Sequence, residues 1–208
     1  MERADPVKIV NAALGQLGDL TIYKRMEVFS RTGCGSSNAL SAAFDHYDFA
    51  KEQMLGALDW SRARKTKALT VSADDPLVTA WSYKYARPAD CLILRKVIDE
   101  DETEYEWEAM REENSVGQDI EWIYCNAADV YARYTVDVGE EQYNSGMAQL
   151  HALYLAEMIA PTVTGNAAKV LMVTERLRRR AELLCLALGA REGYVEDEKG
   201  EHELTDLF

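Results

Sequence analysis

The chain has 208 residues, 48 % of them hydrophobic, so it is long enough to bury the core of one domain, or of a domain with a smaller appendage. Its formal net charge of −13 disfavours stable nucleic-acid binding, which needs Lys and Arg against the phosphates. No run of about twenty apolar residues occurs, which excludes a transmembrane helix, and the N-terminus lacks the pattern of a secretory signal. We therefore expect the chain to fold in a cytoplasm and to contact no membrane.

Two helices are expected in the first third of the chain. The first covers residues 5–17, with Asp5 as its cap and Gly18 as its end. The second covers residues 36–59, with Ser36 or Ser37 as its cap, because apolar side chains recur there at spacings of three and four. Residues 19–35 lie between them and mix Thr, Arg, Ser and Gly, which favours an exposed loop.

A β-rich part is expected over residues 68–138, where the hydrophobic pattern changes to a period of two. Asn126 is expected at the turn between the last two strands of an antiparallel set. The predicted strands are Ala68–Val71, Trp81–Tyr85, Leu92–Ile98, Tyr105–Trp107, Ile120–Tyr124 and Val130–Val138.

The last third of the chain predicts two long helices. The first runs from Glu140 to Ile159 and is broken at Pro161–Asn166, since Pro and Gly together do not continue a regular helix. The second runs to about Leu188, where Gly189 provides a C-terminal stop. Two amphipathic helices joined by a short turn pack antiparallel to bury their apolar stripes.

The predicted fold class is therefore α+β and mainly α. A helical core, residues 1–67 and 139–191, ends in the long antiparallel hairpin, and residues 68–138 form the small antiparallel β-rich insertion. Residues 192–208 carry seven acidic side chains against one lysine, with too little apolar area to fold alone, which predicts a flexible acidic C-terminal tail. Its apolar end, Leu207 and Phe208, offers a partner something to bind.

The chemistry-bearing residues favour a structural protein over an enzyme. There is no glycine-rich phosphate loop and no nucleophile elbow, and the four cysteines are widely scattered. His46 lies near Asp45 and Asp48, but these side chains do not share one direction on a helix, and His151 is expected at a helix surface or interface. The acidic turn 99–104 is expected to be too wet for a glycosidase pair. We predict no catalytic, cofactor-binding or metal-binding residue and no cofactor.

The candidate contact residues are mainly arginines and aromatic side chains. Arg176, Arg179 and Arg180 are expected to share one face of the last helix, away from its buried stripe. Either this face is solvated and paired with neighbouring glutamates, or it docks an acidic neighbour, such as the tail of another subunit. The other candidates are Trp60, Arg64, Leu207 and Phe208.

Several motifs, taken in order, resemble the head-to-tail adaptor family of tailed phages, also called tail tubular protein A. They cover about residues 6–192, although the loop around residues 31–35 and the longer acidic tail depart from the family pattern. The motifs are Tyr47-Asp48-x-Ala50-Lys51 with Asp59-Trp60-Ser61, Tyr83-x-Tyr85-Ala86-Arg87-Pro88, Tyr105-x-Trp107-Glu108, Val130-Tyr131-Ala132-Arg133-Tyr134, and Ala160-Pro161-x-Val163-Thr164-Gly165-Asn166.

The resemblance implies a virion protein, assembled in the host bacterial cytoplasm, whose copies form a ring, generally a dodecamer. Such a ring lies between the portal protein and the tail nozzle, a tail tubular protein B-like protein. It extends the DNA channel and helps to retain and release the genome, which passes without sequence-specific binding. Two alternatives remain open at this stage: a tail-associated cell-wall hydrolase, and a helical partner-binding module.

Overall fold

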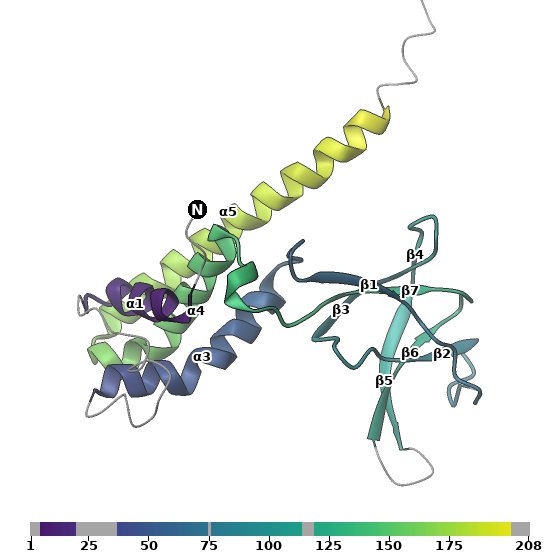
Figure 1. Ribbon diagram of the computed structural model, residues 1–208, viewed down its shortest axis with the longest axis horizontal. Helices are drawn as coiled ribbons and strands as arrows, with labels where there is room; N and C mark the ends of the chain where they lie inside the picture. The colour runs from purple at the N-terminus through teal and green to yellow at the C-terminus, as the bar shows by residue number, and fades with distance from the viewer. Residues whose placement is uncertain (1–4, 20–36, 75, 114–118, 201–208) are drawn as a thin grey trace, which may run out of the picture. The chain divides into compact units, whose positions relative to one another are not determined.

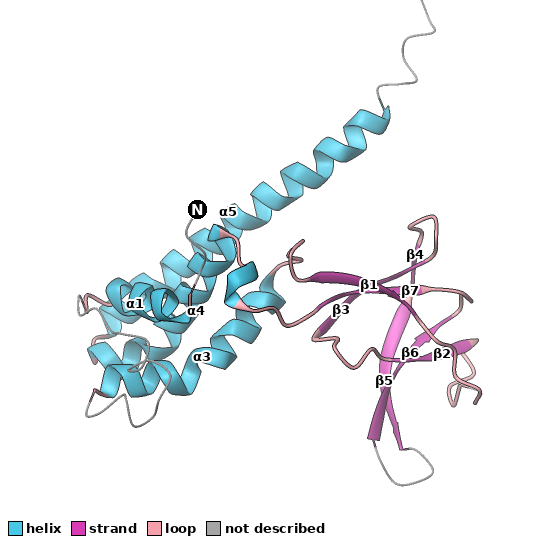
Figure 2. Cartoon of the chain, viewed as in Figure 1, coloured by secondary structure: helices cyan, strands magenta, loops and turns pink. Residues whose placement is uncertain are grey.

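The protein is a mixed α+β molecule with antiparallel sheets (Figure 2). The computed structural model describes residues 5–19, 37–74, 76–113 and 119–200, with side chains described to residue 187 except at 182, 185 and 186. The chain divides into two compact units. The helical unit comprises Met1–Leu58 and Gly139–Phe208, and the β unit comprises Asp59–Val138, inserted between them in sequence.

The first two helices of the helical unit begin at the caps that the sequence predicts. Helix α1 spans Pro6–Gln16, and Asp5 Oδ1 accepts the N–H of Val7 at 2.8 Å. Helix α3 spans Asn38–Ala57 and is capped by the hydroxyl of Ser37. The loop expected over residues 19–35 lies outside the described residues beyond Asp19.

Helix α4, Ser145–Thr164, is the centre of the helical unit. It follows the short helix η1, Glu140–Gln142, and contacts α1, α3 and α5 (Ala167–Gly200), as Figure 1 shows. A helix that is surrounded by others is apolar on most of its faces. The buried residues of α4 accordingly cover most of its circumference: Gly146, Met147, Leu150, His151, Ala152, Leu153, Leu155, Ala156, Ile159 and Ala160.

The break between the last two helices is shorter than the sequence predicts. The expectation that the first of them ends before Pro161 is wrong, because α4 continues through Pro161 to Thr164. A proline removes one helical hydrogen bond, but the packing of α4 against its neighbours holds the backbone in place. The chain leaves the helix at Gly165, whose φ of 57° is left-handed and suits glycine. The side chain of Asn166 then caps α5 by accepting two backbone N–H groups of its first turn.

Helix α5 is longer than expected. The predicted end at Leu188 is wrong, since the helical backbone passes Gly189 and continues to Gly200. A glycine costs a helix only about 1 kcal/mol relative to alanine, and the neighbouring Ala, Arg and Glu residues favour helix. The backbone of residues 192–200, expected in a flexible tail, is therefore helical, while 201–208 lie outside the described residues. Figure 1 shows α5 running past α1 and α4.

Among the described residues, the β unit holds a four-stranded sheet in the order β1-β7-β3-β4 and a three-stranded sheet in the order β2-β6-β5. Every strand pairing in them is antiparallel. The strands are β1 Arg64–Ala68, β2 Tyr83–Ala86, β3 Ile93–Ile98, β4 Glu104–Tyr105, β5 Trp107–Glu113, β6 Asp119–Cys125 and β7 Tyr131–Thr135.

The two sheets share one core. Beyond β1, the bridge between Val71 and Tyr85 links the chain to β2, so the segment after β1 reaches from one sheet to the other. Strands that pass between sheets form the corners of packed β-structures. The core contains side chains from both sheets: Tyr85, Val97, Ile123, Cys125 and Val130.

Three expectations for the β unit are corrected. The first strand is Arg64–Ala68, where Ala68–Val71 was expected, because its mostly exposed charged residues hide the period of two. Strand β5 extends to Glu113, since its acidic sequence carries no apolar alternation. Finally, β6 and β7 do not pair across Asn126, because they belong to different sheets.

In the described part of the chain, no helix is both long enough and apolar enough to cross a membrane.

Candidate interaction surface

Helix α5 has an inner and an outer face. Val173 and Leu177 are buried on the inner face. The outer stripe consists of Met172, Arg176, Arg179 and Leu183, which follow one another at spacings of four, three and four and so share one side of the helix. Met172 is 40 % exposed and Leu183 is 58 % exposed, and both arginines are exposed. An unpaired helix face that mixes apolar and cationic side chains is a candidate contact surface.

Arg180 does not belong to the outer stripe. It follows Arg176 by four residues, so the helical spacing places it beside Arg176 as expected, but it is half-buried whereas Arg176 and Arg179 are exposed. Its Nε atom is buried and has no hydrogen-bond partner among the described residues. Arg180 therefore lies at the edge of the inner face.

The first part of α5 is tied to the end of α1. Lys169 Nζ donates to the carbonyl oxygen of Leu17 at 3.3 Å, and Arg176 Nη1 donates to Gln16 Oε1 at 3.1 Å. A cation beside the carbonyl end of a helix is favourable, because the helix dipole places partial negative charge there. These contacts fix the orientation of α5 and hold its outer stripe in place.

Among the side chains that the structure describes, no glutamate pairs with the arginines of this part of α5. No ion pair of Arg176, Arg178 or Arg179 occurs in the described part of the chain. Glu175 is exposed, and the side chain of Glu182 is not among those described. The first alternative, in which these arginines pair with neighbouring glutamates, is therefore not observed among the described side chains.

The remaining contact candidates are placed differently. Trp60 is only 2 % exposed, so it is a core residue and offers a partner no surface, contrary to the sequence expectation. Arg64 makes an ion pair with Asp59, with 2.9 Å between Nη2 and Oδ2, and is half-buried. Leu207 and Phe208 lie outside the described residues.

A buried polar cluster joins α3, η1 and α4. His151, expected at a surface, is fully buried, and its Nε2 lies 3.2 Å from the carbonyl oxygen of Tyr47. Because a carbonyl only accepts, Nε2 carries the proton, and Nδ1 has no hydrogen-bond partner in the described part of the molecule. Burial lowers the pKa of His151 to about 4, so the ring is neutral at physiological pH.

The rest of this cluster is held by a hydroxyl and an ion pair. The Tyr47 hydroxyl donates to Glu140 Oε1 at 3.1 Å, and Lys51 Nζ lies 3.8 Å from the same oxygen. Burial, reinforced by the charge of Glu140, raises the pKa of Tyr47. The cluster therefore joins α3, η1 and α4 through a neutral His151, the protonated Tyr47 and the Lys51–Glu140 ion pair.

The acidic turn at 99–104 is structural. Asp99 Oδ1 accepts the N–H groups of Asp101 and Thr103, each at 2.9 Å. The hydroxyl of Tyr105 donates to Asp99 Oδ2 at 2.8 Å and lowers the pKa of Asp99, whereas a glycosidase acid needs a raised pKa. Glu102 makes an ion pair with Arg133.

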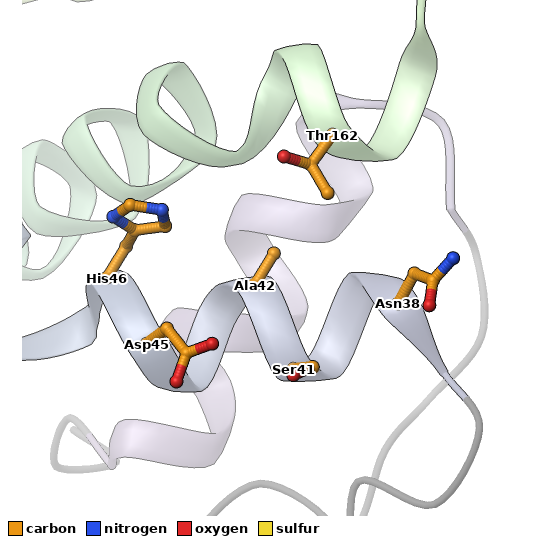
Figure 3. A pocket seen from close by; sticks show the side chains of 6 residues that line it. All are labelled: Asn38, Ser41, Ala42, Asp45, His46 and Thr162. Carbon is orange, nitrogen blue, oxygen red and sulfur yellow. The ribbon is translucent and has the colours of Figure 1, made fainter.

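His46 and its acidic neighbours do not converge. Asp45 and His46 line an open cavity of about 260 Å³ between α3 and Thr162 of α4, and Figure 3 shows their side chains extending in different directions. Asp48 lines another cavity, with Phe44 and Tyr47. Among the described residues, no three His, Cys, Asp or Glu side chains are arranged to hold a metal ion.

Two features of the helical unit, the outer stripe of α5 and the burial of His151, were not predicted from the sequence. The outer stripe left a signal, because the 4-3-4 spacing of Met172, Arg176, Arg179 and Leu183 is visible beside the buried stripe. The burial of His151 left no signal in the sequence, since it depends on the number of helices packed around α4.

No protein-family model and no curated protein matches the chain. Its function is therefore inferred from its own residues.

Proposed function

We propose that the chain is a structural subunit of the head-to-tail connector of a tailed phage virion. Copies form a ring between portal and tail nozzle, and the ring extends the DNA channel and helps to retain and release the genome. The observation that carries the proposal is the exposed outer stripe of α5, a contact surface on a helix whose inner face is buried. The ordered sequence motifs shared with the adaptor family give this surface its context.

Within this proposal, α4 and α5 form the long antiparallel hairpin of the ring wall. The chain leaves α4 at Gly165, and α5 is 34 residues long against 20 in α4, so the last part of α5 has no counterpart in α4. A rigid helix that extends past its own core suits a strut between neighbouring subunits, because identical head-to-tail contacts close a ring. Residues 192–200 are the end of this strut, and the acidic residues 201–208 follow them in sequence.

The net charge of −13 fits a channel through which DNA slides. An acidic wall provides few of the Lys and Arg contacts that hold phosphates, so DNA passes without a stable complex. The proposed partners are therefore other copies of the chain, the portal protein and the nozzle protein, with DNA as cargo.

The cell-wall hydrolase is the less supported alternative. It requires a carboxyl group with a raised pKa, whereas Asp99 is held ionised by its hydrogen bonds. A lytic activity that disappears in Asp99→Ala or in a Glu→Ala variant of this turn, while the variant stays folded, would establish the hydrolase in place of the connector.

Electron microscopy of particles made with and without the chain tests the proposal. The connector account predicts that, without the chain, heads form and lack attached nozzles, and that their DNA is lost. Supplying the purified chain restores the nozzle. Complete tailed particles in its absence would contradict the proposed function.

A further inference from the structure

The outer stripe of α5 and the end of the chain have complementary chemistry. The stripe alternates two apolar side chains, Met172 and Leu183, with two arginines, Arg176 and Arg179. The last eight residues, 201–208, also combine charged and apolar side chains, but their charges are negative. They contain three acidic residues, Glu201, Glu203 and Asp206, and three large apolar ones, Leu204, Leu207 and Phe208. Opposite charges beside matched apolar groups favour association.

The end of the chain does not reach the stripe of its own molecule. The backbone is helical from Arg179 to Gly200, and at 1.5 Å per residue this separates them by about 31 Å. Glu203 is only the third residue after Gly200, so an extended chain carries it about 10 Å from the helix end. Even all eight residues, fully stretched, span at most about 28 Å. Asp206, the last acidic residue, is the sixth after Gly200 and extends only about 21 Å, so the carboxylates that pair with Arg176 and Arg179 come from another molecule.

We propose that the outer stripe of α5 binds the acidic C-terminal segment, residues 201–208, of a second copy of this chain. Arg176 and Arg179 face its carboxylates, and Met172 and Leu183 cover its leucines and phenylalanine. The contact is head-to-tail, because the surface that receives and the segment that is received are different, and such contacts propagate around a ring. The inference deepens the proposed connector function by naming one contact between subunits, and it rests on that function.

The test compares two neighbouring arginines of the full-length chain. Arg179 lies on the outer stripe and Arg178 lies beside it on another side of the helix, and both are exposed and make no ion pair among the described residues. Arg179→Glu and Arg178→Glu make the same charge change at adjacent positions, and Arg and Glu have similar helix propensities. Thermal unfolding establishes that both variants keep the fold of the parent chain.

Sedimentation velocity at about 0.1 M NaCl measures the self-association of each protein. We expect Arg179→Glu to weaken association by about tenfold and Arg178→Glu by less than about twofold. Raising NaCl to about 1 M shortens the Debye length from about 10 Å to about 3 Å, so the wild-type association should fall as well. A wild-type chain that stays monomeric at about 0.1 M NaCl, or equal losses in the two variants, would overturn the inference.

A charge exchange identifies the partner segment. The triple variant E201K/E203K/D206K should associate as weakly as Arg179→Glu, since its basic end meets the arginines of the next copy. Mixing the two variants should restore association, because the lysine end of one fits the glutamate of the other. Each of the two variants measured alone at the same total concentration is the control and should stay weakly associated. Failure of the first mixture to recover would contradict the proposed pairing.

Binding to the portal separates this inference from the proposed function. If the triple variant loses portal binding and keeps wild-type self-association, the C-terminal segment docks on the portal, so the inference fails and the connector function stands. If the charge exchange succeeds and neither the wild type nor the variants bind a portal ring, the contact between copies stands and the connector function fails.

Discussion

The helical unit and the β unit handle buried polar groups in opposite ways. In the helical unit, the buried His151 is neutral and its Nδ1 is unpaired among the described residues. In the β unit, the buried Lys84, 4 % exposed, pairs with Glu112 at 2.9 Å and lies 5.1 Å from the ring centre of Trp122. The helical unit therefore keeps its most buried titratable group neutral and has only the longer, 3.8 Å Lys51–Glu140 pair beside it, whereas the β unit depends on a close charge pair among three strands.

The same contrast extends to the surface. The helical unit leaves a long mixed stripe on α5 unpaired, while charged side chains on the faces and turns of the β unit are held in ion pairs such as Lys96–Glu104 and Arg87–Glu121. A unit whose charges are satisfied internally has less to gain from a partner. We therefore propose the exposed stripe of α5 as the site of the contacts between subunits.

The largest expected effect comes from breaking the buried charge pair. Lys84→Ala leaves the Glu112 carboxylate buried without a counter-charge and should lower the free energy of unfolding of the β unit by about 3–5 kcal/mol. All four tryptophans, Trp60, Trp81, Trp107 and Trp122, belong to this unit. Urea unfolding followed by tryptophan fluorescence therefore measures the loss directly.

The matched control removes both charges. K84M/E112L replaces the pair with apolar side chains and should stay within about 1–2 kcal/mol of the wild type, or be more stable. Helical circular dichroism, dominated by the other unit, should change less than fluorescence in Lys84→Ala. Equal shifts of the two signals would show that the units unfold together and would weaken the comparison.

The second prediction concerns pH and the helical unit. Burial lowers the pKa of His151 from 6.5 to about 4, so only the unfolded chain takes up its proton as the pH falls through this range. The contribution is fully present above pH 6.5 and is lost between pH 6.5 and about 4, at a cost of about 3 kcal/mol. Urea unfolding monitored by helical circular dichroism at several pH values measures it.

His151→Gln separates this residue from the carboxylates, which titrate in the same range. The glutamine amide still donates to the Tyr47 carbonyl but takes up no proton, so the variant should lose less stability between pH 6.5 and 4. An identical pH dependence in the variant and the wild type would mean that His151 is not sealed from water.

The smallest expected effect is at the start of α4. Asn144 Oδ1 accepts the N–H of Met147 at 2.8 Å, and Asn144→Ala should cost about 1 kcal/mol of helical-unit stability. Asn144→Ser retains a capping oxygen and should lose much less. If alanine and serine have the same effect, the cap is not what positions α4.

The sequence was sufficient where local chemistry decides the structure. Asp5 and Ser37 begin helices as expected because capping depends on one side chain and its own backbone. It was insufficient where packing decides: α4 continues through Pro161, and His151 is buried because three helices surround α4. The first strand was predicted at Ala68–Val71 and lies at Arg64–Ala68, since a strand without a buried face shows no hydrophobic period of two.

The candidate surface was predicted in part. The arginines of α5 were found because a basic run stands out in an acidic chain, and Arg176 and Arg179 lie on the exposed face. Arg180 and Trp60 are more buried than expected, since burial at the edge of a helix or beside a strand depends on neighbours that are distant in sequence.

Native mass spectrometry of the full-length chain mixed with the portal protein of the same phage tests the central claim most directly. The account predicts a closed assembly in which a ring of this chain, generally a dodecamer, binds one portal ring, and in which Arg179→Glu reduces ring closure. A chain that forms no complex at any salt concentration, or only a one-to-one complex without higher assembly, would contradict it.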